Sequence, residues 1–339
     1  MRKGAYSRVA RECVCFPGHR VTGRQLVCDC SPPLAFRDMN ILNAFRRNEA
    51  RQHYRQSGYQ VFRSVLPRAH VDALATLVRD VIAPYRGLIQ RQNGNMEEHD
   101  FFPGTSLIRN SLADAHLPIS EAMRPVERAL TTLLTSSELA TVLQRLDGAE
   151  HYNIHQTLLF FAAQTTELHI DSWALDTAPR GFAHTLWIPL QDMDMRAGLP
   201  SVVPWPIGKV VTEEELGLST NCPPGERYGR YQTALAKKVL SDRPEIVTAP
   251  VCKGDLIVWS SLTPHLTLPS LPFPAERLSL QVLLRPIHLR WGSFTDQPRH
   301  HPTNRHIRMT DHFSYFVHEY ISRDYGIAGS LPEPASHLD

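Results

Sequence analysis

From residue 151 onward the chain consists mainly of short segments rich in β-branched and aromatic residues, each bounded by turn-forming residues. Such segments predict β-strands. Helices do not alternate with them, so the pattern favours an α+β chain with a jelly-roll or barrel core over a parallel α/β sheet. The predicted strands cover residues 153–163, 166–172, 183–190, 201–203, 246–248, 255–260 and 277–285.

Helical patterning dominates before residue 151. A polar helix is expected over Asn40–Ser57 and a strand over Gly58–Val65. Pro67–Ile82 places its apolar residues on one helical face, and Ser120–Leu146 repeats them at intervals of three and four. A last helix is expected over Thr310–Tyr325, so that helices flank the strand-rich region on both sides.

The sequence predicts an N-terminal extension, one large domain and an insertion within that domain. Residues 1–38 show no helical or strand period, which indicates a loosely held extension or a natural start at Met39. Their four cysteines are spaced C-x-C-x12-C-x-C, whereas zinc sites usually separate cysteines by two to four residues. Residues 39–330 are expected to form a single domain. An insertion at 205–245, with a helix over Arg230–Leu240, interrupts the strands and is a candidate lid.

Composition excludes several classes of protein. The 339 residues carry a net charge of +2, which gives no basic field for nucleic acid. The longest apolar run, Leu158 to Ala163, is far shorter than the roughly 20 residues of a membrane helix, and no signal-peptide core is visible. A soluble, cytoplasmic protein without nucleic-acid or membrane partners is therefore expected, and its oligomeric state stays open.

The strand at 277–285 alternates in a way that points to a buried site. Its even positions are apolar, while Arg277, Ser279, Gln281 and Arg285 occupy odd positions. In a jelly roll or barrel one face of each strand packs on covering helices and the other faces inward. A polar inward face predicts that something polar is held inside.

Two segments supply candidate metal ligands. His169 and Asp171 are two residues apart on a predicted strand, so their side chains point to the same side. His265 follows the strand 255–260, in a predicted turn, and could complete a facial triad of two histidines and one carboxylate. Such a triad suits Fe(II), because it leaves three positions open for a chelating 2-oxo acid and O₂. Arg277, inward by alternation, would neutralise the remaining negative charge.

These segments resemble the phytanoyl-CoA dioxygenase family of Fe(II)/2-oxoglutarate-dependent oxygenases, over about Tyr54 to Pro286. The resemblance implies a double-stranded β-helix (jelly-roll) core flanked by N-terminal and C-terminal helices. It also implies His169, Asp171 and His265 as iron ligands and Arg277 as the partner of the 2-oxoglutarate carboxylate, with Thr267 beside it. The sequences that carry it are YRQSGYQVFRSVLPRAHVDAL, LHIDSW, TLWIPLQDMDMRAGLPSVVP, GDLIVWSSLTPHLT and RLSLQVLLRP.

Two features concern the surroundings of that site. Trp173 and Trp187 match family positions near the pocket, although tryptophans such as these and Trp259 are more often core residues. The segment PWPIGK at 204–209 departs from the family's Pro-Gly-Ser-His and is expected beside the active site.

The resemblance implies a dioxygenase that hydroxylates a small-molecule metabolite and releases succinate and CO₂. A desaturase, epimerase or ring-forming oxygenase would use the same ligands, whereas Asp171 argues against a halogenase, which usually lacks this carboxylate. A jelly-roll module that binds metal without catalysis is the alternative from another class. The candidate substrate loops are 98–109, ending at Arg109, and 205–245, with Arg227, Tyr228, Arg230 and Tyr231.

Overall fold

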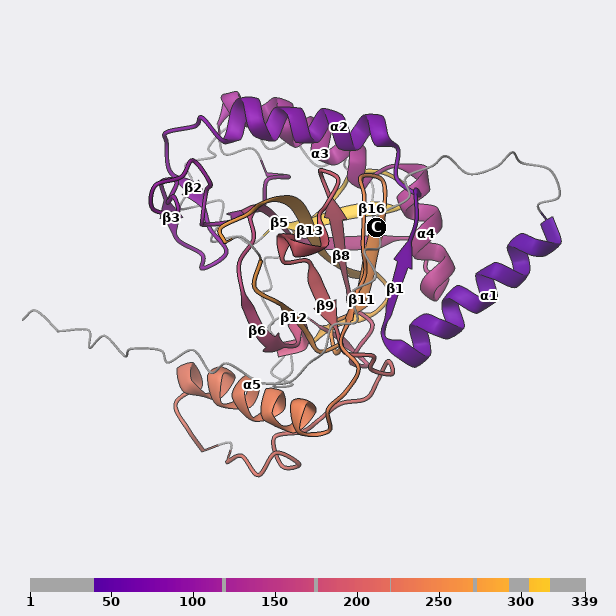
Figure 1. The fold of residues 1–339 in the computed structure, drawn as a ribbon. Helices are drawn as coiled ribbons and strands as arrows, with labels where there is room; N and C mark the ends of the chain where they lie inside the picture. The colour runs from indigo at the N-terminus through magenta and orange to yellow at the C-terminus, as the bar shows by residue number, and fades with distance from the viewer. Residues whose placement is uncertain are drawn as a thin grey trace, which may run out of the picture.

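The computed structural model describes residues 40–117, 120–173, 176–219, 221–270, 273–292 and 305–317. Two antiparallel sheets form its centre (Figure 1). The predicted extension at 1–38 and its cysteines lie outside the described residues. The expectation of a single domain over 39–330 stays a prediction.

The larger sheet has eight strands, seven of them in the order β1-β11-β8-β13-β5-β16-β15, with β4 paired to β5. All neighbours are antiparallel except β16 and β5, which run parallel. The bounds are β1 (Tyr59–Phe62), β4 (Leu112–Ala113), β5 (Tyr152–Ala162), β8 (His184–Pro189), β11 (Leu256–Ser260), β13 (Glu276–Pro286), β15 (Arg305–Arg308) and β16 (Phe313–Val317).

The smaller sheet has the strand order β10-β9-β12-β6. Its strands are β6 (Thr166–His169), β9 (Pro200–Val202), β10 (Val247–Thr248) and β12 (His265–Thr267). Together the two sheets give the expected jelly-roll arrangement, and neither closes into a barrel. Two further pairs join β7 (Asp176–Ala178) to β14 (Arg290–Gly292) and β2 (Ile89–Gln90) to β3 (Met96–Glu97).

The helices cover the sheets from two sides. They are α1 (Asn40–Ser57), α2 (Arg68–Leu77), α3 (Arg124–Leu134), α4 (Ser137–Asp147) and α5 (Pro224–Ser241). Helices α2, α3 and α4 pack their apolar faces on the larger sheet, while α5 lies on the opposite side of the molecule, beside β6 (Figure 1). None of the helices in the described ranges is long and apolar enough to cross a membrane.

The predicted alternation of β13 is confirmed. Leu278, Leu280, Val282 and Leu284 belong to the large apolar cluster that the helices cover. The alternate side chains, including Arg277, therefore point to the other face, toward the interior between the sheets.

The helical region predicted over Ser120–Leu146 is interrupted. Helix α3 ends at Leu134, and α4 begins after Ser136, whose hydroxyl accepts a hydrogen bond from the Leu139 amide. This is an N-cap interaction, which starts a new helix at that point. The change of direction lets both apolar faces reach the same sheet.

The final helix predicted over Thr310–Tyr325 is wrong where the structure describes it. Phe313–Val317 forms β16, beside the start of β5. Phe313 is fully buried in the main core, and the backbone of Tyr152 donates to the His312 carbonyl. Pairing with an available sheet edge outweighs the local helical pattern here. Residues 318–325 lie outside the described part.

Candidate iron site

The structure brings His169, Asp171 and His265 together at one end of the smaller sheet. Their potential ligand atoms all lie within 4.8 Å of one another, and no other group of three such residues meets this condition in the described ranges. His169 ends β6 and is the cross-strand partner of His265, which begins β12. The two imidazole centroids are 4.2 Å apart. Asp171 comes from the short helical turn that directly follows β6.

Two of these details differ from the sequence prediction. Asp171 is not on the strand, because β6 ends at His169. His265 is on a strand and not in a turn, although Pro264 precedes it. The three side chains still converge, because the turn after β6 carries the carboxylate back toward the paired histidines.

Hydrogen bonds fix which nitrogen of each histidine is available to a metal. His169 Nδ1 lies 2.8 Å from the Glu167 carbonyl, and His265 Nδ1 lies 3.0 Å from the Thr263 carbonyl. Because a carbonyl can only accept, both Nδ1 atoms carry the proton. Both Nε2 atoms then keep a free lone pair, as metal-ligating histidines require.

Hydrogen bonds also fix the orientation of the Asp171 carboxylate. Its Oδ2 accepts hydrogen bonds from the Thr185 hydroxyl at 2.6 Å and from the Trp259 indole N–H at 3.1 Å. Its Oδ1 lies 3.6 Å from His265 Nε2. One oxygen is thus occupied by protein donors, and the other faces the two imidazoles.

The protonation states suit metal binding. Burial lowers the pKa of His265 to about 4, against the opposing attraction of Asp171. Burial alone would raise the pKa of Asp171, but the nearby histidines and the two hydrogen bonds hold it below its ordinary value. Neutral imidazole and ionised carboxylate are the forms that bind Fe(II).

Arg277 lies in the interior, 4% exposed, and no carboxylate of the described residues pairs with it. Its Nη1 donates to the Gly198 carbonyl, while its Nε has no hydrogen-bond partner. Burial lowers the pKa of this guanidinium to about 10, so it stays charged at neutral pH. A buried cation without a counter-ion is a site that an anionic ligand would complete.

More unsatisfied polar atoms lie nearby. The Ser270 and Ser279 hydroxyls are buried without partners, and Ser279 is two residues from Arg277 on β13. A Cβ added to Gly198 would lie 3.5 Å from Ser270 Cβ, which places Ser270 close to the carbonyl that Arg277 contacts. Thr267 is buried on β12, on the same side as His265 by alternation. These groups fit a carboxylated cosubstrate.

Arg277 and His265 lie in different sheets. Strand β13, which carries Arg277, pairs with β5 and β8 in the larger sheet. His265 lies in the smaller sheet. Arg277 thus faces the ligands across the jelly-roll interior.

Aromatic residues border the site on two sides. The Trp259 ring lies 4.9 Å from the His265 ring, and Trp187 is buried on the neighbouring strand. Trp173 packs instead against α5, with its ring centroid 5.7 Å from that of Tyr228. Burial, and then the negative charge of Asp171, raise the pKa of Tyr228. Tyr228 of α5 is therefore close enough to the site for the charge of Asp171 to act on it.

Several expected substrate contacts have other partners. Arg227 forms an ion pair with Glu213, and Arg109 forms one with Asp100. The Tyr231 hydroxyl is buried and donates to the Val211 carbonyl. Of the four residues singled out in the insertion, Tyr228 and Arg230 remain exposed.

The loop at 204–209 lies between the end of α1 and the segments that carry the candidate ligands. It begins next to β12, where the Val203 amide donates to the Pro264 carbonyl. The amides of Trp205 and Ile207 then donate to carbonyls at the end of α1. Trp205 and Lys209 also line a small pocket together with Ile170 and Pro264, which are sequence neighbours of the candidate ligands. The loop therefore packs against the segments that carry the ligands, and its role in substrate choice stays a prediction.

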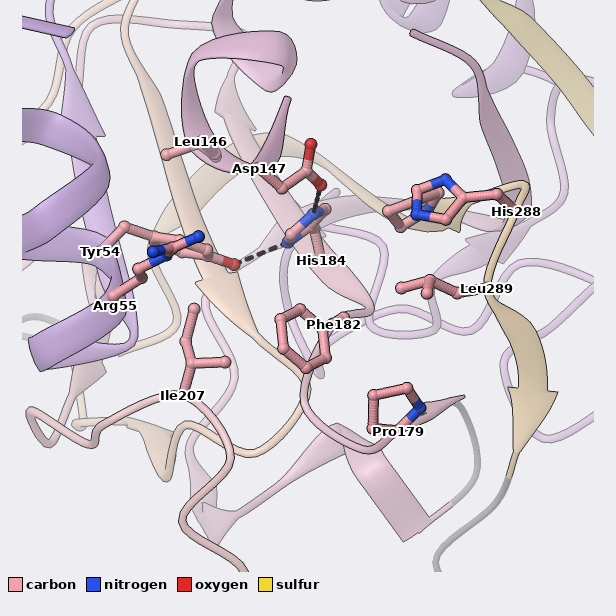
Figure 2. Close-up of a pocket in the computed structure, with 11 residues that line it drawn as sticks. Tyr54, Arg55, Leu146, Asp147, Pro179, Phe182, His184, Ile207, His288 and Leu289 are labelled. Atoms are coloured by element: carbon pink, nitrogen blue, oxygen red, sulfur yellow. Dashed lines mark hydrogen bonds and ion pairs between the residues drawn. The ribbon is translucent and has the colours of Figure 1, made fainter. Parts of the chain in front are cut away.

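A cavity of about 170 Å³ lies on the outer face of the larger sheet, and it contains none of the candidate ligands. Figure 2 shows His184 in its wall, between the Tyr54 hydroxyl at 2.7 Å and the Asp147 carboxylate at 2.6 Å. His184 and Thr185 are adjacent on β8, so their side chains point to opposite faces. This cavity is separate from the interior that holds Asp171.

Thr185 and Trp259 were not predicted as site residues from the sequence. Trp259 was interpreted as a core residue, which its burial supports, but its N–H also reaches Asp171. A polar Thr185 in a strand of apolar residues, at an inward position, is the signal that could have identified the first of them.

Comparisons with known proteins agree with this fold. The family model described as Phytanoyl-CoA dioxygenase (PhyH) matches residues 54–270. No curated protein matches the chain.

Solved structures also resemble it. The epimerase SnoN, in complex with Fe³⁺, α-ketoglutarate and nogalamycin RO, has a TM-score of 0.51 and 20% identity, covering 71% of this chain and 84% of that one. The carbocyclase SnoK from nogalamycin biosynthesis has a TM-score of 0.47 and 18% identity, covering 70% and 83%. EctD from S. alaskensis, with 2-oxoglutarate and 5-hydroxyectoine, has a TM-score of 0.46 and 20% identity, covering 70% of this chain and 75% of that one.

Proposed function

The chain belongs to the phytanoyl-CoA dioxygenase family, and we propose that it hydroxylates a small-molecule metabolite at an iron held by His169, Asp171 and His265. The family makes it a 2-oxoglutarate-dependent non-haem iron oxygenase. When bound, Fe(II) and 2-oxoglutarate supply the oxidising chemistry, with O₂ as oxidant and succinate and CO₂ as coproducts. The observation that carries the ligand assignment is the convergence of three ligand atoms within 4.8 Å.

Each protein group has a distinct task in this proposal. The two Nε2 atoms and Asp171 Oδ1 bind the iron, since the other donor atom of each side chain is already occupied. Arg277 would bind the distal carboxylate of 2-oxoglutarate, with Thr267 beside it, and so leave the 2-oxo acid end of the molecule for the metal. The interior between the sheets excludes water from the reacting groups.

We further propose that the insertion at 205–245 acts as the lid. Helix α5 is anchored to the site, because the Gln232 amide group exchanges hydrogen bonds with the backbone of Ile170. Tyr228 and Arg230 are its exposed candidates for substrate contact, and the positive charge of Arg230 suits an anionic substrate. A Tyr228→Ala variant should raise the KM for the substrate while leaving the affinity for 2-oxoglutarate unchanged.

The test is an incubation of the purified protein with Fe(II), 2-oxoglutarate and a panel of metabolites, with succinate as the readout. Hydroxylation predicts a product 16 mass units heavier than the substrate, by the addition of one oxygen atom. A desaturase or ring-forming enzyme would yield a product two mass units lighter, and an epimerase one of equal mass. Absence of succinate under all conditions would favour a metal-binding module. The cytoplasmic location stays a prediction, which fractionation of the native cells would test.

A further inference from the structure

We propose that Thr185 and Trp259 are positioning residues that hold Asp171 as a ligand through one oxygen only. The proposal rests on the proposed iron site. Both residues come from the larger sheet, on the adjacent strands β8 and β11, where they are directly paired. Asp171 belongs to the turn after β6, in the other sheet. The two hydrogen bonds therefore join the sheets at the iron site.

The geometry distinguishes the two carboxylate oxygens. Oδ2 accepts from the Thr185 hydroxyl at 2.6 Å and from the Trp259 N–H at 3.1 Å. Oδ1 is the oxygen that faces His265 Nε2, at 3.6 Å. Two donors on Oδ2 occupy the electron pairs that a second metal bond would need, so Oδ1 is left to bind the ion.

Binding through one oxygen matters because positions around the metal are limited. Three protein ligands leave three positions of an octahedron, of which 2-oxoglutarate takes two and O₂ takes one. A carboxylate that chelated through both oxygens would occupy one of those three. Thr185 and Trp259 thus keep a position open as well as fixing the ligand's orientation.

Both donors are held rigidly. Thr185 and Trp259 are each 1% exposed, and both lie within the central strands of the larger sheet. Partners of this kind around a metal typically contribute a factor of roughly 10 to 100 in metal affinity. We assign that contribution to these two residues.

The experiment measures the affinity of the full chain for Mn(II), a redox-stable substitute for Fe(II), by calorimetry. Thr185→Val and Trp259→Phe should each weaken binding by roughly 10- to 100-fold, while Thr185→Ser, which keeps the hydroxyl, should restore nearly full affinity. The matched control is Thr157→Val, which removes the hydroxyl of another buried threonine, one that contacts His116. This control should retain wild-type affinity.

A second readout is the charge-transfer absorption of the anaerobic complex with Fe(II) and 2-oxoglutarate, which reports how the cosubstrate chelates the metal. It should shift in Thr185→Val and return in Thr185→Ser. Wild-type affinity in folded Thr185→Val and Trp259→Phe would overturn the proposal. Failure of the wild-type chain to bind Mn(II) would instead overturn the iron site itself. If one of the two variants does not fold, the other still tests the proposal, because Thr185 and Trp259 lie on different strands.

Discussion

Arg277 and Arg285 lie on the same strand, β13, but their guanidinium groups have different partners. Arg285 donates to the carbonyls of Pro286, Ile287 and Leu289, at the end of the strand. Arg277 donates to the Gly198 carbonyl alone, and two buried hydroxyls without partners lie near it. Arg285 is thus committed to the backbone, while Arg277 is free to bind an anion.

We expect Arg277→Leu to raise the KM for 2-oxoglutarate by about 100-fold. A partly desolvated guanidinium–carboxylate pair is worth a few kcal/mol, at about 1.4 kcal/mol for each factor of ten. Arg285→Leu is the matched control and should change the KM little. Initial rates of succinate formation over a range of 2-oxoglutarate concentrations measure both. The opposite ranking would contradict the cosubstrate assignment.

The second prediction concerns the geometry of the carboxylate ligand. Asp171→Glu should abolish most turnover, because the extra methylene displaces the carboxylate by about 1.5 Å, which exceeds the tolerance of catalytic sites. It would also remove the hydrogen bonds that Thr185 and Trp259 make with Oδ2. Succinate formation in the presence of excess Fe(II) provides the measurement. Retention of wild-type turnover would mean that Asp171 does not bind the metal.

The third prediction concerns the pH dependence of stability. Burial raises the pKa of Asp114 to about 7 from an ordinary value of 3.8, while the Thr157 amide opposes the shift. The folded state thus keeps a proton that the unfolded state releases. Protonated Asp114 causes no penalty below the unfolded pKa, and stability is lost as the pH rises through about 7, on the order of 4 kcal/mol in total.

Asp114→Asn tests this directly, because Asn accepts the same hydrogen bond and tolerates the left-handed backbone at this position, φ 52°. The variant should lose less stability than the wild type between about pH 4 and pH 7.5, the range in which the folded state holds the proton and the unfolded state does not, as measured by urea unfolding. Equal losses in both proteins would show that Asp114 does not titrate in this range.

The fourth prediction concerns the buried pair in the wall of the outer cavity. Asp147→Ala would leave the His184 N–H and the Tyr152 hydroxyl without their acceptor. An unsatisfied buried donor costs about 1–3 kcal/mol, so the free energy of unfolding should fall by at least that amount. Asp194→Ala, which removes an exposed ion pair with Arg196, is the control and should have little effect. Iron affinity should survive in both.

Sequence periodicity was sufficient for most of the scaffold. Helix α1 has the predicted bounds, and the inward and outward faces of β13 follow its alternation. The three candidate ligands could be named because a two-residue spacing and a downstream histidine are local features. That two histidines and one aspartate can bind a metal follows from their residue types, which can be read from the sequence.

The parts that failed depend on tertiary contacts. Pairing with β6 and β9, which are far away in the chain, decides which sheet β12 joins. A strand of three residues in a segment bounded by Pro264 and Pro269 carries no local strand signal. For the same reason the sequence does not show that Arg277 and His265 lie in different sheets. Phe313 was assigned to a helix because its burial beside β5 is invisible locally. Hydrogen bonds from Thr185 and Trp259 to Asp171 likewise require the two sheets to face each other.

The most direct test of the account is an anaerobic titration of the wild-type chain and of Asp171→Ala with Fe(II), with the bound metal measured per chain. We predict one Fe(II) per wild-type chain. The variant should lose most of this affinity, because it lacks the only anionic ligand of the three. Circular dichroism should show that it is still folded, although the Thr185 hydroxyl and the Trp259 N–H lose their acceptor. Equal Fe(II) binding by the wild type and by folded Asp171→Ala would contradict the assignment of the iron site.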